Sequence, residues 1–252
     1  MDRRPKRSLT VEQLERRRGL INQRLDDQRA RMNARIDREK AKLSGELTPK
    51  QQEIVSAALE LLDEVGLDNL SLRALAQRLD VRAPALYWHF KNKEALVEHM
   101  AEAILRAEFK DVRPRHEGES WQDWLTFYAS RLRKAMLARR DGGRVVAGAH
   151  LYPAVTLIKW FEDSLVALTS AGVDVETAWH IVRTVSVYTF GYVIEEQAGP
   201  TREERTNTDL MAVVAQYPYV AAAMQAADES GADTEEDFLV GLEYIMRGST
   251  PS

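Results

Sequence analysis

Apolar residues recur at helical spacing along most of the chain, beginning with a thin stripe near the N-terminus. The stripe advances by seven and four residues in turn, through Leu14, Ile21, Leu25, Met32, Ile36 and Leu43. These steps average near 3.6 residues per turn, so the stripe occupies one face of a helix. Polar residues such as Arg18 and Glu39 fill the seam, whereas a stable coiled coil needs two apolar positions per heptad. We expect one long helix over residues 10–43 that does not form a coiled coil alone.

A new helix is predicted to begin at Thr48. Thr48, Pro49 and Gln51 place a capping hydroxyl, a first-turn proline and a glutamine at the spacing of a capping box. Apolar residues follow at helical spacing, and Gly66 is expected to end the run as a C-cap.

The segment after Gly66 predicts two short helices joined by a very short turn. Ser71 is the expected N-cap of a helix through Leu79, and residues 82–89 form the second. Asn92 then caps a longer helix to about residue 110. Apolar side chains of the short pair can form one small core: Leu72, Leu75, Ala76, Leu79, Val81 and Leu86. This arrangement predicts a helix-turn-helix, whose second helix can enter the major groove of DNA.

The rest of the chain also predicts helices. Their expected ranges are near 119–139, 152–171, 174–198, 203–216 and 234–247. Glycine and proline separate them at Gly142-Gly143, Gly172 and Gly199-Pro200. No alternating strand pattern is present, so the predicted fold class is all-α.

Composition narrows the class of protein. The chain has 252 residues and no cysteine, which excludes disulfides and cysteine-ligated zinc. No apolar stretch approaches the roughly 18 residues of a membrane span, and the basic N-terminus lacks the apolar segment of a secretory signal. We expect a cytoplasmic protein that does not enter membranes.

Charge is divided unevenly along the chain. Residues 1–46 hold 14 Lys and Arg against 8 Asp and Glu, whereas the other residues hold 21 against 31. A basic arm on an acidic body is consistent with one end meeting a polyanion. A solvated, charge-rich helix would show the same balance, so charge alone leaves both interpretations open.

Several segments resemble a known family of regulators. "LYWHFKNKEAL" and "ALELLDEVGLDNLSLRALAQRL", within residues 47–110, resemble the DNA-binding domain of the TetR family of bacterial repressors. "EGESWQDWL", "RDGGRVVAG" and "TFGYVIEEQ", spread over 117–197, resemble the regulatory domain of its tetracycline-repressor branch. The resemblance implies an N-terminal extension (1–46), a DNA-binding domain (47–112) and a ligand-binding and dimerisation domain (113–252), in which residues 176–196 and 234–247 match bundle helices that pair in a symmetric homodimer.

The resemblance also implies which residues contact double-stranded operator DNA. Those at or beside the family's DNA-contacting positions are Arg73, Arg82, Ala83, Pro84, Ala85, Tyr87, Trp88, His89 and Lys93. Arg73 can fork onto guanine, while Tyr87, His89 and Lys93 suit phosphate contacts. Trp88 could equally lie in the small domain's core. Arg82 and Ala83 replace an acidic residue and a glutamine of the tetracycline repressors, so a different operator is expected.

A small-molecule inducer is implied as well. The candidate ligand-binding residues are Phe109, Trp124, Phe127, Tyr128, Leu132, Met136, Val146, His150, Trp160, Ser164, Val187, Phe190 and Glu195. Such an aromatic-rich set with a few polar groups suits a flat, largely apolar molecule, although each residue taken alone fits plain core better than a ligand contact.

Magnesium-bound tetracycline is not the expected inducer. Val146 stands where the tetracycline repressors have their magnesium-binding histidine, and Phe109 and Tyr128 replace another histidine and an asparagine. Glu195 remains, but one carboxylate and a displaced His150 make a poor octahedral site. We expect an aromatic ligand bound without metal, and no cofactor.

Other functions are weaker. The five histidines form no HExxH pair, and no Gly-rich phosphate loop or G-x-S-x-G elbow is present, so an enzyme is not expected. The predicted function is a ligand-responsive repressor that controls an efflux, resistance or antibiotic-related gene. The alternative is a helical scaffold assembled through residues 1–46, where a DNA-binding arm and a packing helix both remain open.

Overall fold

The computed structural model describes residues 47–113, 115–149, 154–199, 212–231 and 233–248. The chain divides into two compact units, Met1–Gln52 and Glu53–Ser252, and each is described by itself. The helix predicted over residues 10–43 lies outside the described residues. So does most of the one predicted over 203–216 and the domain boundary predicted after residue 46.

The described part of the first unit begins α2 (Pro49–Asn69). The backbone N–H of Gln51 donates to Thr48 Oγ1 at 3.3 Å, and the backbone N–H of Thr48 donates to Gln51 Oε1 at 3.0 Å. Each residue therefore satisfies a backbone donor of the other, which confirms the predicted capping box.

In the second unit, α2 continues to a sharp change of direction at Gly66, whose φ is 77°. Three short or medium helices follow, α3 (Leu72–Arg78), α4 (Ala83–Tyr87) and α5 (Lys93–Phe109). Ser71 Oγ accepts from the N–H of Ala74, and Asn92 Oδ1 accepts from the N–H of Ala95. These two bonds confirm both predicted N-caps. Such caps can be predicted from sequence because the capping side chain and its backbone partner lie only three residues apart.

The helix-turn-helix is closed by a small apolar core. Helices α3 and α4 contact each other, and the turn between them is fastened by a 3.0 Å hydrogen bond from the N–H of Val81 to the carbonyl of Ala76. Leu75, Ala76 and Leu86 are almost fully buried. Helix α4 is shorter than the predicted 82–89, and it carries its single buried side chain, Leu86, inward.

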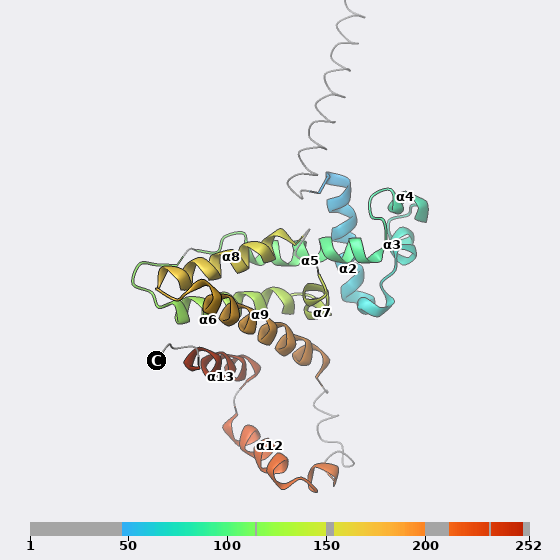
Figure 1. Cartoon of the computed structure of the whole chain (residues 1–252). Coiled ribbons are helices and arrows are strands. Elements are labelled where there is room, and N and C mark those ends of the chain that lie inside the picture. The colour runs from blue at the N-terminus through green and yellow to red at the C-terminus, as the bar shows by residue number, and fades with distance from the viewer. Residues whose placement is uncertain (1–46, 114, 150–153, 200–211, 232, 249–252) are drawn as a thin grey trace, which may run out of the picture. The chain divides into compact units, whose positions relative to one another are not determined.

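The remaining described helices are α6 (Trp121–Leu137), α7 (Gly142–Ala147), α8 (Val155–Ser170), α9 (Val175–Ala198), α12 (Pro218–Ser230) and α13 (Thr234–Arg247). Helix α5 packs against α6, α7 and α8, and α9 packs against α6, α7, α8 and α13 (Figure 1). Four of these helices lie where the periodicity predicts them. Within the described ranges every regular element is an α-helix, and none is long and apolar enough to span a membrane.

Two helices depart from the prediction. Gly142 and Gly143 were expected to interrupt the chain, but they open α7. A Cβ on Gly142 would lie 2.0 Å from the carbonyl oxygen of Met136, and one on Gly143 would lie 3.1 Å from Val193. The glycines therefore allow close packing rather than breaking the helix. Helix α12 was not predicted, although Pro218 at its first turn is a helix-start signal.

Candidate functional site

The second helix of the helix-turn-helix exposes two large aromatic side chains. Tyr87 is 56% exposed and Trp88 is 89% exposed, whereas the adjacent Leu86 is 2% exposed and anchors the helix. Trp88 therefore lies outside the core, as a DNA contact would require, and its contact with DNA stays a prediction. A bare tryptophan is unusual on a free surface, because burying its ring is strongly favourable.

The other predicted DNA contacts lie around these aromatics. The exposed ones are Arg73, Arg82, Pro84 and Ala85, and the half-buried ones are Ala83, His89 and Lys93. Lys93 Nζ also donates to the carbonyl oxygen of Leu67 at 2.7 Å. Lys93 thus ties the start of α5 to the end of α2, a structural role that the sequence did not predict.

Predicted ligand-binding residues from α5, α6 and α8 form one aromatic cluster. Trp124 stacks on Tyr128 at 4.9 Å between ring centroids, and Tyr128 stacks on Trp160 at 5.7 Å. Phe109 meets Tyr128 edge-on at 5.3 Å, and Phe127 lies 5.8 Å from Trp124. Trp124, Phe127 and Tyr128 share α6, and helix packing brings Phe109 of α5 and Trp160 of α8 to them.

Polar groups inside the cluster have specific partners. The hydroxyl of Tyr128 donates to Asp163 Oδ2 at 2.7 Å, and Trp160 Nε1 donates to the carbonyl of Tyr128 at 3.2 Å. Burial and the bond to Asp163 raise the pKa of Tyr128, so its hydroxyl stays neutral and donates. Ser164 is fully buried and donates to the carbonyl of Trp160 at 2.7 Å.

The other predicted ligand residues are placed differently. Leu132, Met136 and Val146 are buried core, and Phe190 is half-buried. Val187 is 59% exposed and Glu195 is also exposed, so in the single chain neither points into the buried cluster. His150 lies outside the described residues.

A groove beside the cluster was missed by the sequence analysis. It has a volume of about 480 Å³ and lies between the α5–α6 loop and α8, with Trp124 in its wall. The loop supplies Arg113 and Arg115, and α8 supplies Lys159 and Asp163. The loop has no helical periodicity, so only its two closely spaced arginines could have drawn attention to it.

Arg113 is held in place by a carboxylate and by rings. Its guanidinium donates to both oxygens of Glu119, at 2.9 and 2.7 Å, and lies 4.7 Å from the ring centroid of Phe127. The bond from Arg113, with a further one from the N–H of His116, lowers the pKa of Glu119 to about 2. Glu119 therefore remains charged and fixes the loop.

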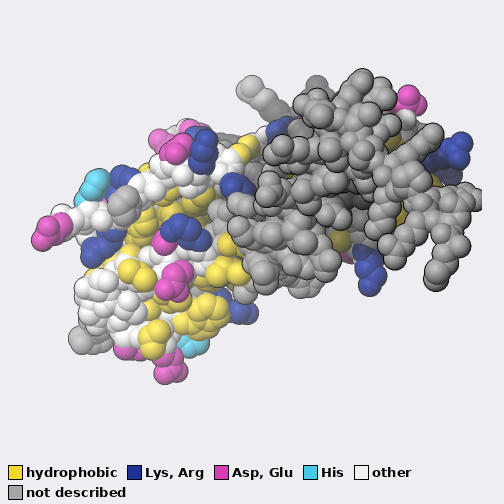
Figure 2. All heavy atoms as spheres, turned by 90° about the horizontal axis from the view of Figure 1, so that it is seen from above, with side chains coloured by type: hydrophobic (Ala, Val, Ile, Leu, Met, Phe, Trp, Pro, Cys, Tyr) yellow, Lys and Arg dark blue, Asp and Glu magenta, His cyan; other side chains and the backbone are white. Residues whose placement is uncertain are grey.

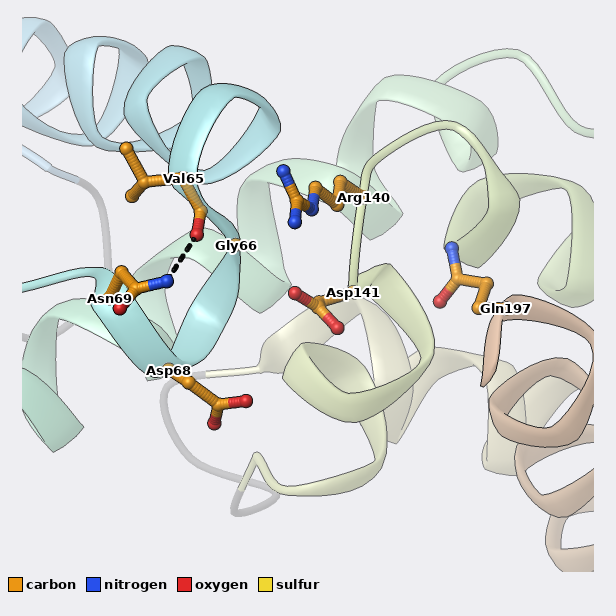
Figure 3. A pocket seen from close by; sticks show the side chains of 7 residues that line it. All are labelled: Val65, Gly66, Asp68, Asn69, Arg140, Asp141 and Gln197. Carbon is orange, nitrogen blue, oxygen red and sulfur yellow. Dashed lines mark hydrogen bonds between the residues drawn. The ribbon is translucent and has the colours of Figure 1, made fainter. Parts of the chain in front are cut away.

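A second cavity, of about 340 Å³, lies where α2 meets the turn between α6 and α7 (Figure 3). Its lining is mostly polar: Val65, Gly66, Asp68, Asn69, Arg140, Asp141 and Gln197. Asn69 donates to the carbonyl of Val65 at 3.0 Å, the contact drawn in Figure 3. Just outside, Arg144 donates to both oxygens of Asp68, at 2.7 and 3.1 Å. The cavity is therefore walled by residues that join the helix-turn-helix region to the larger helical bundle.

The residues at the candidate magnesium positions do not fit that ion. Val146 offers no lone pair and is completely buried, and Glu195 is exposed. Among the described residues, no three His, Asp or Glu side chains are grouped so that they could hold a metal ion.

An exposed aromatic helix in a helix-turn-helix, joined to a helical bundle with an aromatic interior, defines a DNA-binding regulator with a sensory domain. Two family models match the chain. The model of the bacterial regulatory proteins of the tetR family covers residues 54–100, and the tetracyclin repressor-like C-terminal domain covers residues 113–250. The chain belongs to the TetR family, which confirms the resemblance seen in its sequence. Neither matched model describes an enzyme family.

Named relatives agree with this assignment. The class A tetracycline repressor from transposon 1721 of Escherichia coli is 40% identical over 196 residues, covering 77% of this chain and 88% of that protein. A possible TetR family transcriptional regulator from Streptomyces coelicolor A3(2) has a TM-score of 0.70 and 30% identity, covering 79% of this chain and 97% of that one. A substituted form of TetR from Acinetobacter baumannii AYE, solved in complex with minocycline, has a TM-score of 0.62 and 32% identity, covering 80% and 96%.

Proposed function

We propose that this protein is a ligand-responsive transcriptional repressor. It binds a palindromic DNA operator as a homodimer and leaves the DNA when a largely apolar, aromatic molecule binds its regulatory domain. The observation that carries this proposal is the exposure of Tyr87, on a helix whose only buried side chain is Leu86, and of Trp88, the C-cap residue of that helix. Such a helix presents rings and basic groups outward, where a DNA groove would receive them.

The dimer is supported by the outer face of α9 and α13. These helices pack on each other, and the hydroxyl of Tyr188 donates to the carbonyl of Phe238 at 3.0 Å. Apolar side chains on both helices remain exposed in the single chain: Val187 59%, Leu239 36%, Val240 48% and Tyr244 70%. Two such helices complete a four-helix bundle only with a second copy, and a two-fold dimer reads a palindrome.

The inducer is an aromatic molecule bound without magnesium. The stacked cluster of Trp124, Tyr128 and Trp160 supplies flat apolar surface for such a molecule. The buried valine at position 146 supports a site without metal. A ligand can release DNA only if it binds more tightly to the state in which the two helix-turn-helix domains of the dimer no longer fit the spacing of the operator. Control of an efflux, resistance or antibiotic-related gene is proposed by analogy with the tetracycline repressors.

Selection of bound fragments from the source organism's genomic DNA tests this function. The wild type should retain a small set of fragments, and Tyr87→Ala with Trp88→Ala should abolish retention while the melting temperature stays unchanged. Arg106→Gln, an exposed basic residue on α5, is the matched control and should retain the same fragments. Equal retention by the wild type and the double variant would overturn the assignment of the reading helix.

A further inference from the structure

We propose that the groove between the α5–α6 loop and α8 binds a planar aromatic anion, such as an aryl carboxylate or a phenolate. Its negative group pairs with Arg115, and its ring lies along the apolar wall of the groove. This inference rests on the proposed function, because it names the chemical class of the inducer.

The charges that line the groove do not cancel. Arg113 is compensated by Glu119, and Lys159 Nζ lies 2.6 Å from Asp163 Oδ2. Arg115 donates to the backbone carbonyl of Glu119. Within the described part of the chain, Arg115 forms no ion pair with a carboxylate. The groove therefore keeps one uncompensated positive charge, which favours an anion over a neutral or cationic ligand.

The only carboxylate that lines the groove among the described residues is already engaged. Asp163 accepts from the hydroxyl of Tyr128 at 2.7 Å and from Lys159 at 2.8 and 2.6 Å. Donors of the protein itself therefore already occupy the carboxylate oxygens of Asp163. A ligand carboxylate placed at Arg115 meets a basic loop rather than a free acidic residue.

Trp124 adds a second, independent observation. It lines the groove, it is only 3% exposed, and its indole Nε1 has no hydrogen-bond partner among the described residues. A buried donor without an acceptor is costly and uncommon. A ligand oxygen that reaches this donor would satisfy it, so the site favours a molecule with an acceptor next to its ring.

The size and the walls of the groove fit an aromatic molecule. Its volume of about 480 Å³ falls within the range of small-molecule sites, roughly 300–1,000 Å³. Val112, Val166 and Ala167 form its apolar wall. On the face of the molecule shown in Figure 2, apolar side chains reach the surface between basic and acidic ones. An amphipathic aromatic anion matches the apolar and charged residues that line the groove better than an aliphatic or polycationic molecule does.

A matched pair of probes tests the charge requirement. 2-Naphthoate and 2-naphthamide share the same rings and a carbonyl acceptor but differ in charge, and calorimetry on the full-length protein measures the affinity of each. We expect the wild type to bind the naphthoate about tenfold more tightly, and Arg115→Gln to remove that difference, as expected for a charge-assisted bond. Trp124→Phe keeps an aromatic ring but removes the donor, so it should weaken both probes severalfold. Arg106→Gln, which is exposed and does not line the groove, should change neither affinity.

The outcomes separate this inference from the proposed function. Equal affinity for both probes, an unchanged preference in Arg115→Gln, or binding of neither probe overturns the anionic site. Retention of genomic fragments is measured on the same preparation. If the wild type selects DNA but shows no naphthoate preference, the ligand class is wrong and the repressor stands. If naphthoate binds as expected but no DNA is selected, the groove stands and the proposed function fails.

Discussion

The carboxylate of Asp141 accepts a hydrogen bond from the backbone N–H of Leu67 at 2.8 Å, across 74 positions of sequence. Both partners sit at irregular points of the backbone. Asp141 has a φ of 55°, and Gly66, immediately before Leu67, has a φ of 77°. The end of α2 is therefore fastened to the turn between α6 and α7 by a residue held in the left-handed region. This bond is one physical connection between the helix-turn-helix region and the regulatory bundle.

Replacing Asp141 should weaken this connection. Asp141→Ala leaves the partly buried N–H of Leu67 without its acceptor, so the free energy of unfolding should fall by about 1–3 kcal/mol. Asp141→Asn keeps an acceptor oxygen and tolerates the left-handed backbone, so its loss should be smaller. Urea unfolding of both variants measures the difference. Equal stability of the alanine variant and the wild type would show that the bond contributes nothing.

Trp88 and Lys93 should separate DNA binding from stability. Trp88→Ala removes a side chain that packs on little, so unfolding free energy should change by less than about 0.5 kcal/mol while DNA affinity falls. Lys93→Ala also removes the bond to the carbonyl of Leu67, so it should cost about 1 kcal/mol of stability as well. Chemical denaturation and duplex titration of each variant check this. A large loss of stability in Trp88→Ala would instead show that this side chain is packed in the core.

Glu102 is expected to act as a cap supplied from another helix. Its carboxylate accepts from the backbone N–H of Thr156 at 2.9 Å and from its hydroxyl at 2.8 Å, whereas the N-cap residue of α8, Ala154, has no capping side chain. Glu102→Ala should therefore lower unfolding free energy by about 1 kcal/mol and speed hydrogen exchange at Thr156. Glu162→Ala, an exposed carboxylate on α8, should do neither. Unchanged exchange at Thr156 in Glu102→Ala would refute the cap.

His99 should make stability depend on pH. Its ring meets Phe90 edge-on at 5.5 Å, and burial lowers its pKa below the ordinary 6.5, against an opposing effect of Glu98. The unfolded chain therefore binds the proton more readily, so the stabilisation is complete above pH 6.5 and declines as the pH falls toward the folded pKa. His99→Gln should show a shallower decline below pH 6.5 in denaturant titrations. Parallel pH profiles for the two proteins would contradict this.

Local signals in the sequence predicted most of the helices. Ser71 and Asn92 were recognised as caps because a cap and its backbone partner lie three residues apart. The aromatic candidates Phe109, Tyr128 and Trp160 were also identified, and the structure brings them together.

Contacts between distant residues could not be predicted in this way. No pattern in one sequence connects Glu102 to Thr156 or Leu67 to Asp141, because each pair meets only after the helices pack. Helix α7 was missed for a related reason, since Gly142 was taken as a break, whereas the packed structure requires a residue without a side chain there. The predicted domain boundaries and the assignments of DNA-contacting and ligand-contacting residues stay predictions.

A DNase footprint of the purified protein on a genomic fragment that it selects tests the central claim most directly. Two helix-turn-helix domains related by a two-fold axis should protect two half-sites of inverted sequence, about one helical turn or slightly more apart. The footprint should weaken as salt rises, because phosphate contacts release counterions. A dyad-symmetric footprint occupied by two chains is the result that the account predicts. A footprint without dyad symmetry, or one occupied by a single chain, would contradict it.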